Sequence, residues 1–201
     1  RYALCESGEG GYLFFNTYVR HYVQPDREIE WSCGNGSGRL SVKSGQYGCY
    51  PFRLPVKGGV IESIEATPLC VLNDTHYVFW SDTGVAALSA TGDIADKIVL
   101  LNKEQALDSY IFRYRKKDRL FITDAQMYED DEGIHAEYGR TGKDVVVKVF
   151  PDVNLGGGWN KCASDGMWGT YIKKAKKCVT RARITPLGGN DGHLDYKIEV
   201  I

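Results

Sequence analysis

The triplet Asp82-Thr83-Gly84 comes closest to a catalytic motif in this 201-residue chain. It follows the apolar run 77–80, and aspartic proteases present their catalytic carboxylate in such a setting. Acid proteolysis needs two carboxylates that share one proton. A single-chain enzyme would need a second Asp-Thr/Ser-Gly, which the chain lacks, and a homodimeric enzyme would need an apolar segment ending in glycine behind the catalytic loop. We therefore predict that Asp82 follows the end of a strand and hydrogen-bonds the backbone, and that Gly84 accepts a positive φ.

Other catalytic patterns are also incomplete. The four histidines have no metal-ligand spacing, and there is no Gly-x-Ser-x-Gly elbow, although a Ser/His/Asp triad assembled in space stays open. The glycine-rich stretch 34–38 precedes a strand-like run rather than a helix, which argues against a phosphate-binding loop. The acidic stretch 129–133 offers oxygen ligands for calcium but lacks the spacing of an EF-hand, which favours a solvated turn. We predict no catalytic residue, no cofactor and no metal site.

The cysteines indicate a secreted protein. They are Cys5, Cys33, Cys49, Cys70, Cys162 and Cys178. No two form a Cys-x-x-Cys pair, so this even, widely spaced set predicts disulfide bonds, with buried free thiols as the alternative. Glycosylation sequons at Asn35 and Asn73 agree with secretion. The chain starts at Arg1 without a signal-peptide pattern, so we expect that a leader was removed.

The composition favours a β-rich protein without a nucleic-acid partner. The chain has 23 Gly and 13 Tyr but only 2 Met, which is typical of short strands separated by many turns. Its 25 basic and 26 acidic residues give a formal net charge of -1, whereas nucleic-acid-binding domains are usually strongly basic. No apolar run is long enough to span a membrane.

We predict a mainly β fold in two disulfide-stapled units. Apolar residues at 15, 18, 19, 22 and 23 predict an amphipathic helix over 12–23, although the aromatic and β-branched content partly favours a strand. Strand-like runs follow at 28–31, 39–43, 50–54, 60–64, 69–72, 77–80, 98–101, 110–114, 119–122, 135–138, 145–150, 170–173, 178–184 and 194–201. The small-residue stretch 84–96 is the expected boundary between an α+β N-terminal unit, 1–90, and a C-terminal β-sandwich, 91–201.

The cysteines divide along the same boundary, with four before it and two after it. We therefore expect Cys162 to pair with Cys178. The first four are expected to form two bridges in one of three pairings, among which the sequence does not choose.

Candidate contact residues lie in the second unit. Arg115, Lys116 and Lys117 would bind an anionic surface, with a solvated hairpin turn as the alternative. Trp159 and Trp168 lie beside glycines on expected loops, which suits sugar stacking or a protein contact. Burial against a Cys162–Cys178 bridge is the alternative for the tryptophans.

The cysteine-led start RYALCESGEGG, the expected helix after it, the stapled strand segment to about Trp80 and the β-rich remainder resemble one family. This family is the dual-domain secreted-in-xylem effectors of plant-pathogenic Fusarium fungi. The resemblance covers the whole chain in architecture and cysteine layout, without a diagnostic catalytic or binding motif, and the cysteine pair in the second half departs from some members. It implies a helix-plus-strands N-domain, a C-terminal β-sandwich and removal of a pro-segment by a kexin-type protease. It also implies a non-enzymatic role in host colonisation and recognition by plant immune receptors.

We therefore expect a secreted, monomeric, non-enzymatic virulence effector that contacts an unidentified host protein or receptor. The alternative is a secreted carbohydrate- or lipid-binding lectin-like module, which would use the basic turn with Trp159 and Trp168.

Overall fold

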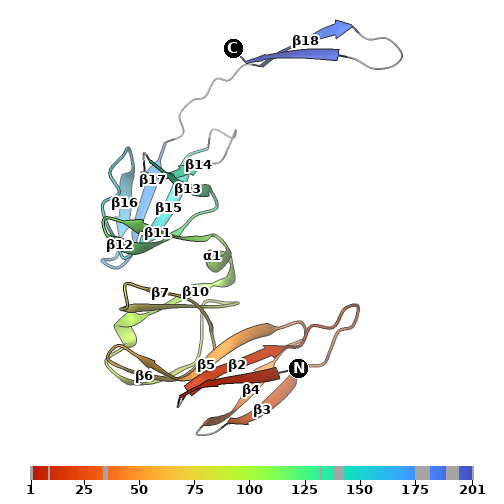
Figure 1. Ribbon diagram of the computed structural model, residues 1–201, viewed down its shortest axis with the longest axis vertical. Coiled ribbons are helices and arrows are strands. Elements are labelled where there is room, and N and C mark those ends of the chain that lie inside the picture. The colour runs from red at the N-terminus through yellow and green to blue at the C-terminus, as the bar shows by residue number, and fades with distance from the viewer. Residues whose placement is uncertain are drawn as a thin grey trace.

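The computed structural model describes residues 2–8, 10–33, 36–131, 133–137, 143–174, 182–188 and 195–200. This part of the chain is mainly β, as the composition predicts, with nineteen strands and one short α-helix, α1 (Lys103–Leu107). The sheets follow one another along the length of the molecule (Figure 1). No helix in the described ranges is long and apolar enough to cross a membrane.

The first sheet has five antiparallel strands in the order β1-β2-β5-β6-β9, and the hairpin β3-β4 covers part of one face. The bounds are β1 Tyr2–Ser7, β2 Gly10–Asn16, β3 Arg27–Cys33, β4 Gly36–Val42, β5 Tyr47–Val56, β6 Gly59–Ile64 and β9 Leu88–Gly92. Leu13 and Phe15 of β2 meet Leu40 and Val42 of β4 in the buried core between the two layers. Burial of these four side chains holds the hairpin on the sheet.

The helix predicted over 12–23 is wrong, because this segment begins inside strand β2. Successive side chains of β2 point to opposite faces, so Leu13 and Phe15 are buried whereas Phe14 and Asn16 are exposed. The apolar positions that fit a helical period combine the buried Phe15 with residues of the following turn that lie in solvent. They therefore form no common buried face, and the aromatic content favours the strand.

A three-stranded sheet in the order β10-β8-β7 lies in the middle of the stack (Figure 1). The bounds are β7 Thr67–Leu72, β8 His76–Ser81 and β10 Ile98–Asn102, and β8 and β10 are parallel. Both faces of this sheet are covered. Phe79 packs with Ile61 of the first sheet, whereas Val78 packs with Leu120 and Phe150 of the second half. Burial on both faces explains why β8 has an apolar run rather than an alternating pattern.

The stretch 84–96, expected to separate two units, contains β9 and the first two residues of a short 3-10 helix, Ala95–Lys97. Strand β9 pairs with β6, and β10 then pairs with β8. The chain therefore returns to the sheets of the first half before α1 leads into the second half.

The second half contains a sheet in the order β11-β12-β15-β17-β16 and two hairpins, β13-β14 and β18-β19. The bounds are β11 Ser109–Tyr114, β12 Lys117–Ile122, β13 Gln126–Asp130, β14 Gly133–Glu137, β15 Val145–Phe150, β16 Asn160–Ser164, β17 Gly169–Lys173, β18 Ala182–Gly188 and β19 Asp195–Val200. Val147 and Val149 of β15 meet Met127 and Ala136 of the β13-β14 hairpin in a buried core. The opposite face of the sheet meets the central sheet through Leu120 and Phe150.

The cysteines with described side chains, Cys5, Cys49, Cys70 and Cys162, are free thiols. The side chains of Cys33 and Cys178 lie outside the described residues, and the predicted Cys162–Cys178 bridge therefore does too. The other predicted bridges are not confirmed. Every pairing of the first four cysteines needs a bridge between two of Cys5, Cys49 and Cys70, and the structure contains none among these three.

The strand order explains this result for Cys5 and Cys49. Cys5 on β1 and Cys49 on β5 lie on opposite sides of β2, where Cys5 faces Tyr12 and Cys49 faces Phe14. Two strand spacings come to roughly 9–10 Å, whereas a disulfide needs Cα atoms within about 7 Å.

Candidate functional site

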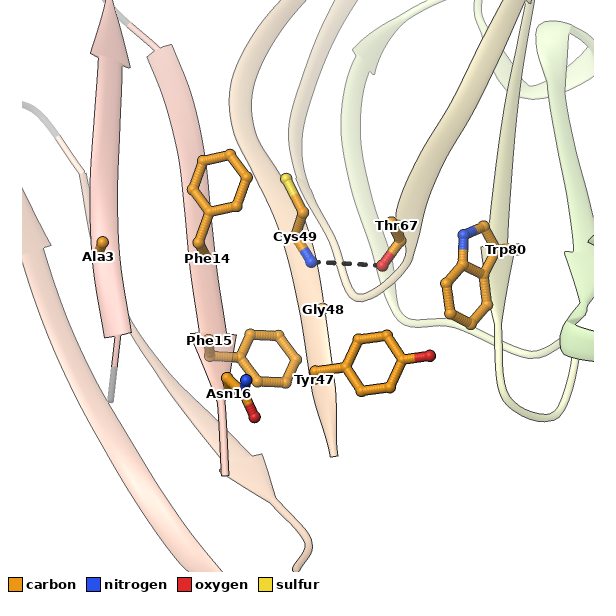
Figure 2. Close-up of a pocket in the computed structure, with 9 residues that line it drawn as sticks. All are labelled: Ala3, Phe14, Phe15, Asn16, Tyr47, Gly48, Cys49, Thr67 and Trp80. Atoms are coloured by element: carbon orange, nitrogen blue, oxygen red, sulfur yellow. Dashed lines mark hydrogen bonds between the residues drawn. The ribbon is translucent and has the colours of Figure 1, made fainter. Parts of the chain in front are cut away.

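An open groove of about 530 Å³ lies where the first sheet meets the central sheet. Its lining is mainly aromatic and apolar, and we call it the aromatic groove (Figure 2). The lining residues are Ala3, Phe14, Phe15, Asn16, Tyr47, Gly48, Cys49, Thr67 and Trp80.

Strand register brings these residues together. Ala3, Phe14 and Cys49 lie directly opposite one another on β1, β2 and β5. Thr67 and Trp80 are opposite on β7 and β8 of the central sheet. The Cys49 N–H donates to the Thr67 hydroxyl at 3.3 Å and connects the two rows, as Figure 2 shows. The groove is therefore formed by rows from two sheets rather than by a loop.

Two of the aromatic side chains in the groove are open to solvent. Phe14 is 45% exposed and Tyr47 is 55% exposed, and Trp80 is half-buried beside them. Gly48 leaves room for the ring of Phe15, because a Cβ at position 48 would lie 2.7 Å from that ring. Exposed aromatic rings around a hollow are typical of sites that take up an apolar or planar group.

Charged groups stand at the edge of the aromatic groove. The Lys103 ammonium lies 5.6 Å from the centre of the Tyr47 ring and 3.9 Å from a carboxylate oxygen of Asp82. Both charged side chains are about half exposed, so the pair is a weak, solvent-screened contact. A ligand group that binds the Lys103 ammonium or the Asp82 carboxylate more strongly can therefore replace this ion pair at a small cost in free energy.

Asp82 follows the end of strand β8 at Ser81, as predicted, and Gly84 has φ +76°. The described hydrogen bonds of the turn come from Ser81 and Thr83 rather than from Asp82. The Ser81 hydroxyl donates to the Val85 carbonyl at 2.9 Å and accepts from the Gly84 N–H at 3.0 Å, and the Thr83 hydroxyl accepts from the Val85 N–H at 3.4 Å. The Asp82 carboxylate is paired with the Lys103 ammonium, whereas acid proteolysis needs a second carboxylate beside the first.

Cys49 in the groove lining and Cys70 further along β7 are held as neutral thiols. Burial raises the pKa of Cys70 to about 11. Burial, with a smaller effect of the nearby Cys5, also raises the pKa of Cys49. Because the thiolate is the reactive form, neither side chain is an activated nucleophile at neutral pH. Within the described ranges no group of three His, Cys, Asp or Glu side chains is placed to hold a metal ion.

Comparison with known proteins assigns no family. No protein-family model matches the chain. No curated protein matches it in sequence either. The geometry of the groove therefore carries the functional argument.

The residues predicted as contacts lie in three settings. Arg115 and Lys116 form the two-residue turn between β11 and β12, with φ values of +51° and +65°, and Lys117 begins β12. Positive φ at both central residues is the geometry of a tight hairpin turn. The Arg115 guanidinium lies 5.4 Å from the centre of the Tyr114 ring.

The two tryptophans pack against different cores. Trp159 packs beside the core around Phe121, and the Lys173 ammonium lies 5.5 Å from the centre of its ring. Trp168 packs on Phe150, with ring centres 5.0 Å apart. Each is half-buried in its own core, so the two do not share one packing environment.

Of the two sequons, Asn35 lies outside the described residues and Asn73 lies in the turn between β7 and β8. The Asn73 side chain donates to the Asp118 carbonyl and accepts from the Asp118 N–H, both at 2.9 Å. Both polar atoms of the Asn73 side-chain amide are therefore engaged within the fold.

Sequence reasoning missed Phe14, Tyr47 and Thr67 as site residues. Phe14 falls in the segment 12–23 that is predicted as a helix, and Tyr47 lies outside the predicted strands, after a glycine turn. The signal that could have identified Phe14 is the alternation of a strand over 10–16, which places Phe14 on the exposed face between the buried Leu13 and Phe15.

Proposed function

We propose that this chain is a secreted, non-enzymatic binding protein that acts as a virulence effector of a plant-pathogenic fungus. In this proposal it contacts a host protein through the aromatic groove. The observation that carries the proposal is the open ring surface of Phe14 and Tyr47 next to Trp80. A few residues, often aromatic, provide most of the binding energy at many protein interfaces. The groove is therefore suited to bind an apolar side chain of the partner.

The chemistry around the groove supports binding rather than catalysis. The Cys49 and Cys70 thiols are protonated at neutral pH, and Asp82 faces an ammonium group. None of these groups is placed as an activated nucleophile or a general base.

The effector role itself rests on the resemblance to the dual-domain secreted-in-xylem family. With it we propose a monomer of two units, of which the second is a β-sandwich, that acts in host tissue and is recognised by plant immune receptors. The proposal also includes extracellular disulfide bonds. Cys162 is exposed on β16, and Cys178 is its proposed partner.

The disulfide part has a direct test. Peptide mapping by mass spectrometry of the natively secreted chain, without reduction, is expected to yield a Cys162–Cys178 peptide. Free thiols at both positions would contradict the secreted, bridged chain while leaving the groove untouched.

The groove is tested by colonisation of a susceptible host plant. A fungal strain that expresses the Phe14→Ser, Tyr47→Ser double variant is expected to colonise no better than a deletion strain. Both side chains are substantially exposed, so the variant should fold, which circular dichroism and secretion levels would check. Val146→Ser, at a 43% exposed position on β15, is the matched control and should colonise like the wild type. Equal colonisation by all strains would overturn the role of the groove.

A lectin-like function is the second candidate. Tyr47 with Lys103 above its ring, and Trp159 with Lys173, both combine an aromatic face with a polar donor, as sugar sites do. A glycan array probed with the wild type, Tyr47→Ser and Trp159→Ala separates the candidates. Glycan binding lost in one of these variants would favour the lectin, whereas no glycan binding would eliminate it.

A further inference from the structure

The turn 17–24, which connects β2 and β3, carries large apolar side chains in solvent. Tyr18 is 65% exposed, Val19 44%, Tyr22 63% and Val23 84%. Single exposed apolar residues are ordinary, but a contiguous group marks an interaction surface. We call this segment the tyrosine turn.

Hydrogen bonds hold the tyrosine turn in place. The Tyr22 N–H donates to the Val19 carbonyl at 3.2 Å, which closes a tight turn around Arg20 and His21. At its start, the Thr17 hydroxyl donates to the Lys43 carbonyl at 2.6 Å. At its end, the Gln24 N–H donates to the Ser44 hydroxyl at 2.9 Å. The apolar side chains are therefore presented by a braced segment.

Cationic groups accompany these apolar side chains. Arg20 occupies the tip of the turn, and Lys43 lies in the neighbouring connection that anchors it; both are exposed. The Arg20 Nε–H donates to the His21 ring at 3.1 Å. Asp26 also lies at this end, and its carboxylate accepts from the Ser44 N–H at 3.3 Å. The two cations thus belong to the segment that carries the exposed tyrosine and valine side chains and to the connection that anchors it, while the Asp26 carboxylate is directed to the backbone.

We propose that the tyrosine turn binds the surface of a bilayer that contains anionic phospholipid. Tyr18, Tyr22 and Val23 enter the interfacial layer, and Arg20 and Lys43 approach the phosphate groups. Tyrosine suits this layer because its ring is apolar and its hydroxyl is polar, and basic residues are attracted to an anionic leaflet. Neither described cavity is lined by these residues, so the turn favours entry into a soft surface over enclosure of a ligand.

This binding mode goes beyond the proposed contact with a host protein, because it uses other residues. Failure of lipid binding would leave the groove proposal standing, and failure of the groove variants in colonisation would leave lipid binding standing.

The test is cosedimentation of the full chain with vesicles of phosphatidylcholine alone or mixed with phosphatidylserine. The wild type is expected to bind the mixed vesicles more strongly and to lose affinity as salt is added. Arg20→Gln and Lys43→Gln should each weaken binding about fivefold, because each basic residue near an anionic surface contributes about 1 kcal/mol. The Tyr22→Ser, Val23→Ser double variant should weaken it by about tenfold or more through lost apolar burial.

Matched controls lie elsewhere on the chain. Lys57→Gln removes an exposed cation next to the opposite end of β5 from Tyr47, and Leu107→Ser removes a 76% exposed apolar side chain from α1. Both should bind mixed vesicles like the wild type. Absence of binding to mixed vesicles, or equal losses in the control and turn variants, would overturn the proposal. Binding of a protein partner through the same turn without vesicle binding would also overturn it.

Discussion

The side-chain amide of Asn73 exchanges two hydrogen bonds with the backbone of Asp118, each 2.9 Å long. Asn73 lies in the turn after β7, whereas Asp118 is 45 residues further on, in β12. The side-chain amide of Asn73 therefore pairs with the Asp118 backbone as the backbone of a neighbouring strand would, and it connects the central sheet to the second half. Asn73 has φ +53°, a region that asparagine enters more readily than most residues.

Replacing Asn73 should destabilise the folded chain through loss of this bridge. Glycine accepts the positive φ at position 73, so Asn73→Gly measures the loss of the two amide hydrogen bonds without added backbone strain. We expect this variant to lose about 1–3 kcal/mol in the free energy of unfolding. Asn73→Ala should cost more, because a Cβ at this φ adds backbone strain. Urea unfolding followed by tryptophan fluorescence measures both.

The neighbouring position supplies the control. Asp74 is exposed and has φ +54°, so Asp74→Gly makes the same backbone change without removing the bridge. We expect this variant to unfold within about 0.5 kcal/mol of the wild type. Equal losses for Asn73→Gly and Asp74→Gly would mean that the bridge contributes nothing measurable.

Strands with a strong apolar pattern could be predicted from the sequence. Each predicted run overlaps an observed strand; β15, with its Val-rich sequence, and β8 are examples. Strand β9 is missed because all its residues are exposed and, apart from Leu88, small or polar, so only its backbone pairing with β6 defines it. The error at 12–23 arose because a strand and the exposed turn after it together imitate a helical period.

The candidate site could not be predicted, because its parts come from separate sheets. Trp80 belongs to the apolar run before Asp82, and Thr67 lies opposite it in the central sheet, but Phe14 joins them only through the packing of two sheets. No local pattern specifies which sheet faces meet. Likewise, a local pattern identifies Asn73 as part of a sequon, while its hydrogen-bond partner Asp118 is far away in sequence.

Asp152 organises the polar side of the second-half sheet and should contribute to stability at neutral pH. Its side chain is only 11% exposed and accepts hydrogen bonds from Lys161, from Ser164 at 2.6 Å and from Tyr171 at 2.7 Å. Asp152→Asn keeps the shape but loses the charge, and we expect a loss of about 1–3 kcal/mol in the free energy of unfolding at pH 7. Asp93→Asn, at an exposed position, is the control with little expected effect.

The effect of Asp152→Asn should depend on pH. Burial raises the pKa of Asp152, but the hydrogen bonds from Lys161, Ser164 and Tyr171 outweigh it and lower the pKa from 3.8 to about 2. A lowered carboxyl pKa stabilises the fold above pH 3.8, and this stabilisation is lost as the pH falls toward 2. The difference between the wild type and Asp152→Asn should therefore shrink across this range in urea titrations. A difference that stays constant from pH 7 to pH 2 would contradict the ionised role of Asp152.

Gly169 is constrained by the same carboxylate. A Cβ at position 169 would lie 2.1 Å from Asp152 Oδ1 and 2.6 Å from the Tyr171 ring. We expect Gly169→Ala to lower the free energy of unfolding by about 1–3 kcal/mol or more, because the carboxylate must move away from Tyr171. In the Gly169→Ala, Asp152→Ala double variant the clash with the carboxylate is absent, so its loss should be smaller than the sum of the two single losses. Strict additivity would show that the carboxylate does not set the space at Gly169.

Asp82→Asn tests the protease-like motif directly. The Asp82–Lys103 pair spans 3.9 Å between side chains that are 60% and 45% exposed, so its removal should change the free energy of unfolding by less than about 1 kcal/mol. Lys103→Gln removes the other partner and should match it within that range. Neither variant should alter hydrolysis of a casein or peptide substrate measured at acid pH, because a single carboxylate beside an ammonium cannot share a proton as a protease dyad does. Peptidase activity of the folded wild type that disappears in Asp82→Asn would show that a second carboxylate reaches Asp82 and that the groove is an active site.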